Sequence, residues 1–349
     1  MVQTQVDKSK LPSFVKDYPE LLSDKVGGQV LGCSDQWFAA CVNLIKITPP
    51  VWDAEKFVDT GKWMDGWETR RHNPSNDWCI LRLGIPGVIK GFEIDTAYFT
   101  GNYPPHASIE ALCDDHEPTF DKLEKSDKWV EILPKVDLKA GYIEQSKQYF
   151  ATESNTKKVT HLRFKIYPDG GVARLRVYGA VSKDWSLVIP GELVDLAAIE
   201  NGGLVPLCSD MFYGNANNVI MPGRGINMGD GWETKRRRGP GNDWLIVRLA
   251  ALGKVRRIEV DTNWFKGNFP TSCSIDATDA TDPASPDAKW TQILANTPLS
   301  AHHRHFFQRE LEHCVQDSNY LHIRLNVYPD GGVSRFRIHC IPNSIPTTN

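Results

Sequence analysis

Several features that define common classes of protein are missing from this sequence. The eight cysteines among the 349 residues are scattered singly, with no Cys-x-x-Cys pair, so reduced thiols fit better than a disulfide framework. No run of apolar residues approaches the roughly 20 that a membrane-spanning helix requires, and residues 1–14 lack the apolar core of a signal peptide. We therefore expect a cytoplasmic protein that does not enter a membrane.

The sequence also has little excess charge and none of the common catalytic signatures. The formal net charge is -3, which gives no electrostatic reason to expect nucleic acid or an acidic membrane surface as a partner. There is no nucleophile elbow, phosphate-cradling glycine loop, His-Glu-x-x-His helix or dinucleotide fingerprint. Covalent nucleophilic catalysis, kinase chemistry and Rossmann-type cofactor binding are therefore poorly supported.

What the sequence does contain is one segment of about 160 residues written twice. Asp-Gly-Trp-Glu-Thr-Arg-Arg from Asp65 reappears as Asp-Gly-Trp-Glu-Thr-Lys-Arg from Asp230. Three further motifs recur in the same order, beginning at Asn76 and Asn242, at Glu93 and Glu259, and at Tyr167 and Tyr328. The duplication predicts an N-terminal extension (1–19), a first repeat (20–185), a linker (186–200) and a second repeat (201–349). The apolar and acidic end of the connection could form one short helix.

Within each repeat, apolar and polar residues alternate as they do in half-buried strands. Around the turn Pro-Asp-Gly-Gly, which needs the positive φ that glycine permits, this alternation places six apolar residues on one face. They are Leu162, Phe164, Ile166, Ala173, Leu175 and Val177. The opposite face, with Arg174 and Arg176, is predicted to be free for chemistry. Short strands separated by Gly/Pro turns predict an all-β fold of two tandem antiparallel β-sandwiches of jelly-roll type.

The first candidate site is the charged loop that begins each duplicated motif. Arginine offers a planar fork that fits a carboxylate, and nearby carboxyl groups can exchange protons with a substrate. The alternative interpretation is that Asp-Gly is only a turn, the tryptophans anchor the core and the charges pair with one another. The candidate residues are Asp65, Trp67, Glu68, Arg70 and Arg71, with Asp230, Trp232, Glu233, Arg236 and Arg237 in the second repeat.

The second candidate is a strand that carries two carboxylates and is followed by an asparagine. These residues are Glu93, Asp95 and Asn102, with Glu259, Asp261 and Asn268 in the second repeat. The carboxylates alternate with apolar residues and so point away from the core, where they could supply a general base beside an amide. Alternatively, they pair across the sheet with Arg163, Arg174 and Arg176.

Histidines offer weaker candidates. The His/Arg face that contains His161 and His322 is explained by ordinary surface charge. His302, His303 and His305 form a metal-like cluster, but the first repeat has no histidine at the corresponding places, so we expect no metal site. His106, which stands opposite Ser272, occurs only in the first repeat and could favour that site as a proton shuttle, or could be an exposed loop residue.

Taken together, the duplicated motifs resemble those of the allantoicase family, and the resemblance covers nearly the whole chain. It implies galactose-binding-like jelly-roll domains, a homo-oligomer and the hydrolysis of allantoate to ureidoglycolate and urea in purine breakdown. We expect no cofactor, and the alternative of a divalent metal held by residues from separate loops stays open. Allantoate carries two ureido groups and a carboxylate on one carbon. Loss of urea therefore requires an acid for the departing nitrogen and a base for the incoming water.

The resemblance implies roles for the candidate residues in either repeat or in a shared cleft. Arg70 and Arg71, or Arg236 and Arg237, would clamp the substrate carboxylate. The proton transfers would fall to Asp65, Glu68, Asp95, Asp230, Glu233 and Asp261, and further substrate contacts to Trp67, Asn102, His106, Trp232 and Asn268. Two rival functions remain open: a non-catalytic protein that binds carbohydrate or another small ligand, and a metal-dependent ureide hydrolase that releases ammonia.

Overall fold

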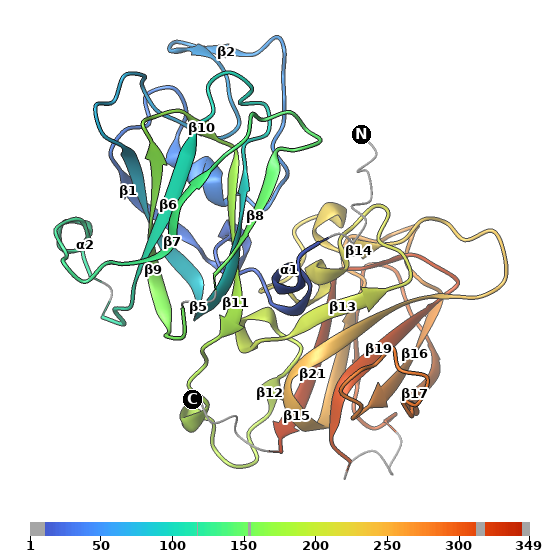
Figure 1. The fold of residues 1–349 in the computed structure, drawn as a ribbon. Coiled ribbons are helices and arrows are strands. Elements are labelled where there is room, and N and C mark those ends of the chain that lie inside the picture. Colours follow the sequence, from blue (N-terminus) through green and yellow to red (C-terminus); the bar gives the residue numbers. More distant parts are fainter. Residues whose placement is uncertain (1–10, 117, 153–154, 312–317, 344–349) are drawn as a thin grey trace. The chain divides into compact units, whose positions relative to one another are not determined.

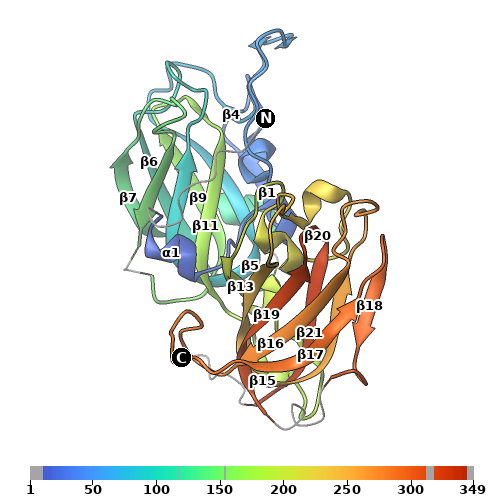
Figure 2. The same cartoon turned by 90° about the vertical axis from the view of Figure 1, so that its right-hand side faces the viewer.

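The computed structural model describes residues 11–116, 118–152, 155–311 and 318–343, which form two compact units. The first unit comprises the described residues of 12–182, and the second comprises the described residues of 183–349. Each unit is a β-sandwich built around one very long strand (Figures 1 and 2). The predicted all-β fold of two tandem sandwiches is therefore confirmed, and we call the units the first and second repeat.

In the first repeat, the 19-residue strand β5 (Asp77–Asp95) belongs to both layers of the sandwich. Its first half pairs with β1 (Gln29–Cys33) and β9 (Val159–Tyr167), and the layer continues through β6 (His106–Leu112) and β7 (Val130–Asp137). Its second half, after a register shift between Arg82 and Gly87, pairs with β8 (Lys147–Ala151) and β11 (Arg174–Val181). A short pairing of β4 (Trp67–Glu68) with β10 (Gly171–Val172) closes one end.

The second repeat follows the same plan around β15 (Asp243–Asp261). The first half of β15 pairs with β13 (Leu204–Cys208) and β19 (Tyr320–Tyr328), followed by β16 (Ser272–Thr278) and β17 (Thr291–Pro298). The second half pairs with β18 (Arg304–Phe307) and β21 (Arg335–Pro342). The end is closed by β14 (Trp232–Glu233) and β20 (Gly332–Val333).

The remaining elements are short. They are α1 (Ser13–Asp17), α2 (Phe120–Glu124), the hairpin strands β2 (Phe57–Val58) and β3 (Gly61–Lys62), and the 3-10 helices at Asp24–Val26, Cys41–Ile45, Trp185–Leu187, Ile199–Asn201, Ala216–Ile220 and Met228–Asp230. Among the described residues, no helix has the length and apolar character needed to cross a membrane.

The segments that flank the repeats differ from the sequence-based prediction. Residues 1–10 of the predicted extension lie outside the described residues, whereas α1 belongs to the first repeat, where Phe14 packs against Tyr178. The predicted connecting helix is wrong. Residues 194–195 instead form β12 (Val194–Asp195), which pairs with β21 and is followed by a single 3-10 turn. Pairing with β21 satisfies the backbone N–H and C=O groups of β12. The sequence periodicity of so short a segment does not predict this pairing.

The predicted core face is confirmed, because all six alternating apolar residues of the first hairpin are fully buried. The turn that joins its strands has positive φ at Gly170 (138°), and the matching turn of the second repeat has positive φ at Gly331 (131°), as expected. The expectation that the opposite face is free is wrong. Arg174 is only 2% exposed, since residues 46–65 cover it and accept hydrogen bonds from its guanidinium group. His161 and His322 are likewise buried rather than part of a charged surface.

The two tryptophans of the duplicated loop are also core residues. Trp67 and Trp232 have no exposed surface, and each donates its indole N–H to the backbone oxygen of an aspartate, Asp35 or Asp210, at 2.8 and 2.7 Å. A buried indole with its N–H paired is a stable anchor. The rings therefore present no face to a ligand. The structure supports the alternative interpretation, in which the two tryptophans anchor the core and do not bind substrate.

Candidate active site

Three duplicated motifs meet at one end of each sandwich, which is closed by β4 and β10 in the first repeat and by β14 and β20 in the second. In the first repeat, Glu68 lies opposite Gly171 in the β4–β10 register. The N–H of Gly171 donates to the backbone oxygen of Asn102 at 2.7 Å, which ties the Gly-Asn segment to the hairpin. As a result, Asn102 Nδ2 donates to Glu68 Oε1 at 2.6 Å.

The second repeat contains the same arrangement. Asn268 Nδ2 donates to Glu233 Oε1 at 2.5 Å, and the N–H of Gly332 donates to the backbone oxygen of Asn268 at 2.8 Å. The sequence placed the glutamates and asparagines in separate candidate sites, and the structure combines them. We call each of these combinations a Glu–Asn pair.

The carboxyl group of Glu68 is well suited to hold a proton. Burial raises its pKa, and although the hydrogen bond from Asn102 and the positive charge of Arg71 both lower it, burial prevails. Only Oε1 accepts a hydrogen bond from a residue within the described parts of the chain, so Oε2 remains available to a ligand. Such a carboxyl group can act as a general acid at a higher pH than an exposed glutamate.

Asp65 and Asp230, in contrast, are committed to the structure. Asp65 is buried and forms an ion pair of 2.7 Å with Arg174, supported by Lys46 at 3.2 Å and by the N–H of Val51. Burial alone would raise the pKa of Asp65, but the hydrogen bond and charge of Arg174 outweigh it, so the pKa lies below its ordinary value. Asp230 pairs with Arg335 in the same way, at 3.0 Å.

The strand carboxylates have structural partners as well. Asp95 and Asp261 each accept a backbone N–H two residues further on, at 2.9 Å. Glu93 pairs with Lys147 at 3.2 Å. Glu259 accepts two hydrogen bonds from the guanidinium group of Arg304. The predicted cross-sheet neighbours are confirmed for two arginines, since Arg174 lies opposite Asp95 and Arg176 opposite Glu93. Their direct hydrogen bonds go elsewhere, to Asp65 and to the backbone oxygens of residues 44 and 46. Arg163 pairs with Glu110 instead, so that part of the prediction is wrong.

The arginines of the charged loops differ in how free they are. Arg70 is held by Asp35, which also accepts the backbone N–H of Arg70 at 2.7 Å. Arg237 is held by Asp243 at 2.6 Å. Arg71 and Arg236 are exposed, and the charge of Arg71 acts on Glu68. Of the predicted clamp residues, these two are the ones free to meet a substrate.

The histidine candidates lie elsewhere or have structural partners. His106 begins β6 and lies opposite Tyr167, with its Nδ1 2.9 Å from Asp137. His302 accepts the N–H of Trp264, and His305 accepts the N–H of Ser300. Over the ranges that the structure describes, no group of three or more His, Cys, Asp and Glu side chains is placed to hold a metal ion.

Sequence reasoning missed Asp35 and Asp210 as parts of these sites. Each follows the duplicated Cys-Ser pair, and each accepts the backbone N–H of the charged loop that lies beside it. The recurrence of Cys-Ser-Asp at Cys33 and Cys208 was visible in the sequence, but it indicated only where each repeat begins.

The fold and the site define a protein of two homologous β-sandwiches, each with a glutamate–asparagine pair at one end. Comparison with known sequences gives this class a name, because the profile of the allantoicase repeat matches residues 19–182 and 194–343. The chain is 68% identical to the allantoicase of Dictyostelium discoideum over 95% of this chain and 90% of that protein. It is 45% identical to a probable allantoicase of Burkholderia mallei over 94% and 95% of the two chains. The chain therefore belongs to the allantoicase family.

Solved structures agree with the sequence comparison. The crystal structure of allantoicase from Saccharomyces cerevisiae is 34% identical to this chain and superposes with a TM-score of 0.80. The match covers 97% of this chain and 99% of the yeast chain. The resemblance inferred from the motifs is thus confirmed over the full architecture of two repeats.

Proposed function

We propose that this protein hydrolyses allantoate to ureidoglycolate and urea. The observation that carries the proposal is its membership of the allantoicase family over nearly its whole length, with 68% identity to a named allantoicase. A non-catalytic carbohydrate-binding role is not favoured by this relationship. The presence of a Glu–Asn pair with the same geometry in both repeats supplies a candidate for the chemistry.

The reaction breaks a bond between nitrogen and a tetrahedral carbon. In the proposed mechanism, protonated Glu68 gives its proton to the departing ureido nitrogen, and the C–N electron pair leaves with urea. The lone pair of the remaining ureido nitrogen forms an imine-like bond to the same carbon. Water then adds to that carbon and returns a proton to the Glu68 carboxylate, which restores the acid.

We assign this chemistry to the first repeat. Glu68 there combines a free Oε2 with the nearby charge of Arg71, which can hold the substrate carboxylate through its planar fork. Asn102 keeps the glutamate in place and offers an amide to a ureido group. The matching arginine of the second repeat, Arg236, lines a pocket to which Glu233 does not contribute.

The proposed reaction is tested by incubating the purified protein with allantoate and measuring urea and ammonia separately. Urea and ureidoglycolate in equal amounts, without ammonia, are expected because the C–N bond at the tetrahedral carbon breaks. Ammonia release would indicate attack at a ureido carbonyl, and binding of a glycan without any turnover would favour the non-catalytic rival.

Replacing Asn102 with alanine is expected to move the pH dependence of kcat. The hydrogen bond from Asn102 stabilises the Glu68 carboxylate and lowers its pKa, so its loss raises that pKa further. A general acid works in its protonated form, and the rate falls as the pH rises through its pKa. The descending limb of the profile should therefore shift to higher pH in Asn102→Ala and stay in place in the matched Asn268→Ala variant. A shift to lower pH would contradict the assignment of Glu68 as the acid.

We also propose that catalysis requires no metal ion. Support comes from the described residues, which contain no cluster of metal-ligating side chains, and from an acid and a cationic clamp that suffice for the proton transfers. Urea release is expected to be unchanged after dialysis against a chelator. Loss of activity that a divalent cation restores would contradict this proposal.

A homo-oligomer is the assembly we propose. The hairpin of β2 and β3 in the first repeat exposes Phe57 and Val58, and Trp52 shortly before it is also exposed. Their apolar surface is suited to contact with another copy of the chain. Sedimentation analysis should give a mass above that of one chain, and Phe57→Asp should lower it. A single-chain mass for the wild type would contradict this proposal.

A further inference from the structure

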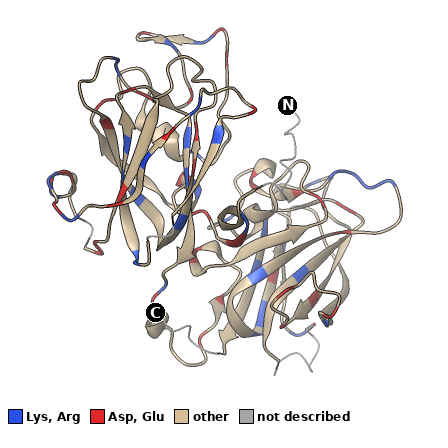
Figure 3. Ribbon diagram, in the orientation of Figure 1, with Lys and Arg blue, Asp and Glu red and all other residues tan. Residues whose placement is uncertain are grey.

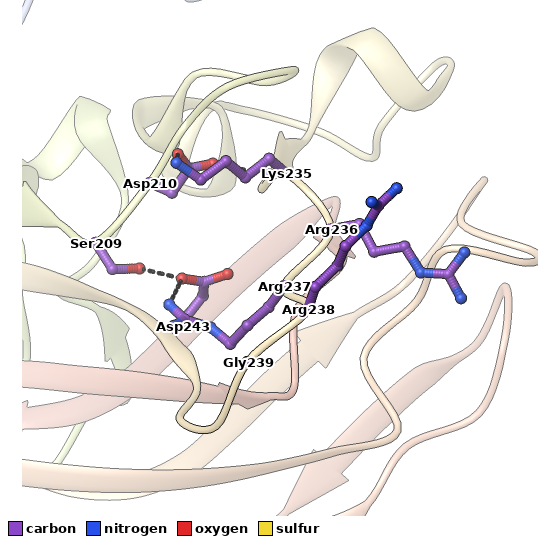
Figure 4. A pocket seen from close by; sticks show the side chains of 8 residues that line it. All are labelled: Ser209, Asp210, Lys235, Arg236, Arg237, Arg238, Gly239 and Asp243. Atoms are coloured by element: carbon purple, nitrogen blue, oxygen red, sulfur yellow. Dashed lines mark hydrogen bonds and ion pairs between the residues drawn. The ribbon is translucent and has the colours of Figure 1, made fainter.

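A pocket of about 320 Å³ lies in the second repeat, apart from the Glu–Asn pair of that repeat. Neither Glu233 nor Asn268 contributes to its wall. The eight lining residues, shown in Figure 4, are Ser209, Asp210, Lys235, Arg236, Arg237, Arg238, Gly239 and Asp243. With four consecutive cations in its wall, the pocket is suited to an anion rather than to an apolar ligand.

The floor of this pocket is preorganised. Asp243 accepts hydrogen bonds from Ser209 Oγ at 2.9 Å and from Arg237 at 2.6 Å. The backbone N–H of Arg237 donates to Asp330 at 2.7 Å, and that of Lys235 donates to Asp210 at 2.8 Å. The loop therefore has a fixed backbone, which lowers the entropy cost of binding a ligand.

Two positive charges remain after the ion pairs of the floor are counted. Arg237 is neutralised by Asp243, and Lys235 lies 3.7 Å from Asp210. Arg236 and Arg238 are exposed, and Figure 4 shows their side chains extending away from both aspartates. In Figure 3 the loop is a continuous blue segment, whereas elsewhere basic and acidic residues are interspersed.

The corresponding loop of the first repeat carries fewer positive charges than residues 235–238. Residues 70–73 at the corresponding loop are Arg-Arg-His-Asn, and Arg70 is held by Asp35 through its side chain and its backbone. Asp77, the counterpart of Asp243, accepts a hydrogen bond from Ser34. The excess positive charge is thus larger in the second repeat.

We propose that this pocket binds a small dianionic oxyanion of the phosphate class. Arg236 and Arg238 would each offer a planar fork to its oxygens, and the fixed floor would hold the loop in position beneath it. An anion there relieves the repulsion between the two remaining positive charges, which gives the site a preference for two negative charges over one. The proposal goes beyond allantoate hydrolysis, because it concerns a site that shares no residue with the Glu68 site.

Titration calorimetry with inorganic phosphate at pH 8, where phosphate is a dianion, tests the proposal. The expected result is saturable binding to the wild-type protein in a buffer whose chloride concentration keeps the ionic strength constant. The Arg236→Ala/Arg238→Ala variant should bind phosphate about tenfold or more weakly, because it loses charge-assisted hydrogen bonds. Arg236→Lys/Arg238→Lys should fall between the two, since it keeps the charges but not the forks.

The matched control is Lys289→Ala/Arg309→Ala, which removes two exposed positive charges from another part of the second repeat. Its phosphate affinity should equal that of the wild type. Equal weakening in the control and the pocket variant would overturn the proposal, because binding would then follow net charge alone. Absence of saturable binding, or full competition between phosphate and allantoate, would also overturn it. Circular dichroism of each variant verifies that the fold is intact.

Discussion

Glu68→Gln is expected to lower kcat for urea release by about 10²- to 10⁴-fold, the contribution typical of general acid–base catalysis. Glutamine keeps the size of the side chain but has no proton to give to the departing nitrogen. The KM for allantoate should change much less, since the proposed carboxylate clamp, Arg71, is untouched. Steady-state kinetics measures both quantities.

Glu233→Gln is the matched control for this prediction, because Glu233 has the same hydrogen bond to an asparagine in the second repeat. Its kcat should remain close to that of the wild type if the first repeat carries the reaction. A large loss in Glu233→Gln alone would move the reaction to the second repeat. Unchanged turnover in both variants would remove the Glu–Asn pairs from the mechanism.

Asp65→Ala is expected to destabilise the first repeat by about 3–5 kcal/mol, because it leaves the guanidinium group of Arg174 buried without a counterion. Hydrogen exchange followed by mass spectrometry measures the loss of stability separately in each repeat. The second repeat, with its intact Asp230–Arg335 pair, is the internal reference. Asp59→Ala, which removes an exposed carboxylate of the same repeat, should have little effect. The prediction would be contradicted if the amide hydrogens of the first repeat exchanged as slowly in Asp65→Ala as in the wild type.

The pH dependence provides a second check on the Asp65 ion pair. Its pKa in the folded state is lowered, so its contribution to stability is complete above the unfolded-state value of about 3.9 and is lost as the pH falls through the folded-state pKa. The difference between wild type and Asp65→Ala should therefore be full at neutral pH and shrink in strong acid. A difference that grows as the pH falls would contradict the ion-pair explanation.

Much of the fold could be predicted from the sequence, because the periodicity of a strand is a property of neighbouring residues. Alternation predicted the buried face of the first hairpin correctly, and the duplicated Pro-Asp-Gly-Gly segment predicted glycines with positive φ. The repeat as a whole predicted two sandwiches of the same plan. The connecting segment was misjudged because β12 is stabilised by pairing with β21, whose residues lie more than 140 positions away.

The candidate site was only partly readable, because charged residues look alike until their partners are known. Alternation showed that Arg174 points away from the apolar core, but residues 46–65 cover it and bury it. Asp65 looked as reactive as Glu68 in the same short loop. Their partners separate them: Asp65 meets a buried arginine, whereas Glu68 meets a neutral amide.

The sequence by itself determined that this chain is a duplicated β protein of the allantoicase family, since motifs and two-residue periodicity are written in neighbouring positions. Only the tertiary structure decided which charged groups hold the fold together and which remain available to a ligand. The physical reason is distance along the chain: Asp65 and Arg174 are separated by 109 residues, and Glu68 and Asn102 by 34. Burial and pairing, which set the pKa of each group, arise when the folded chain brings such residues together.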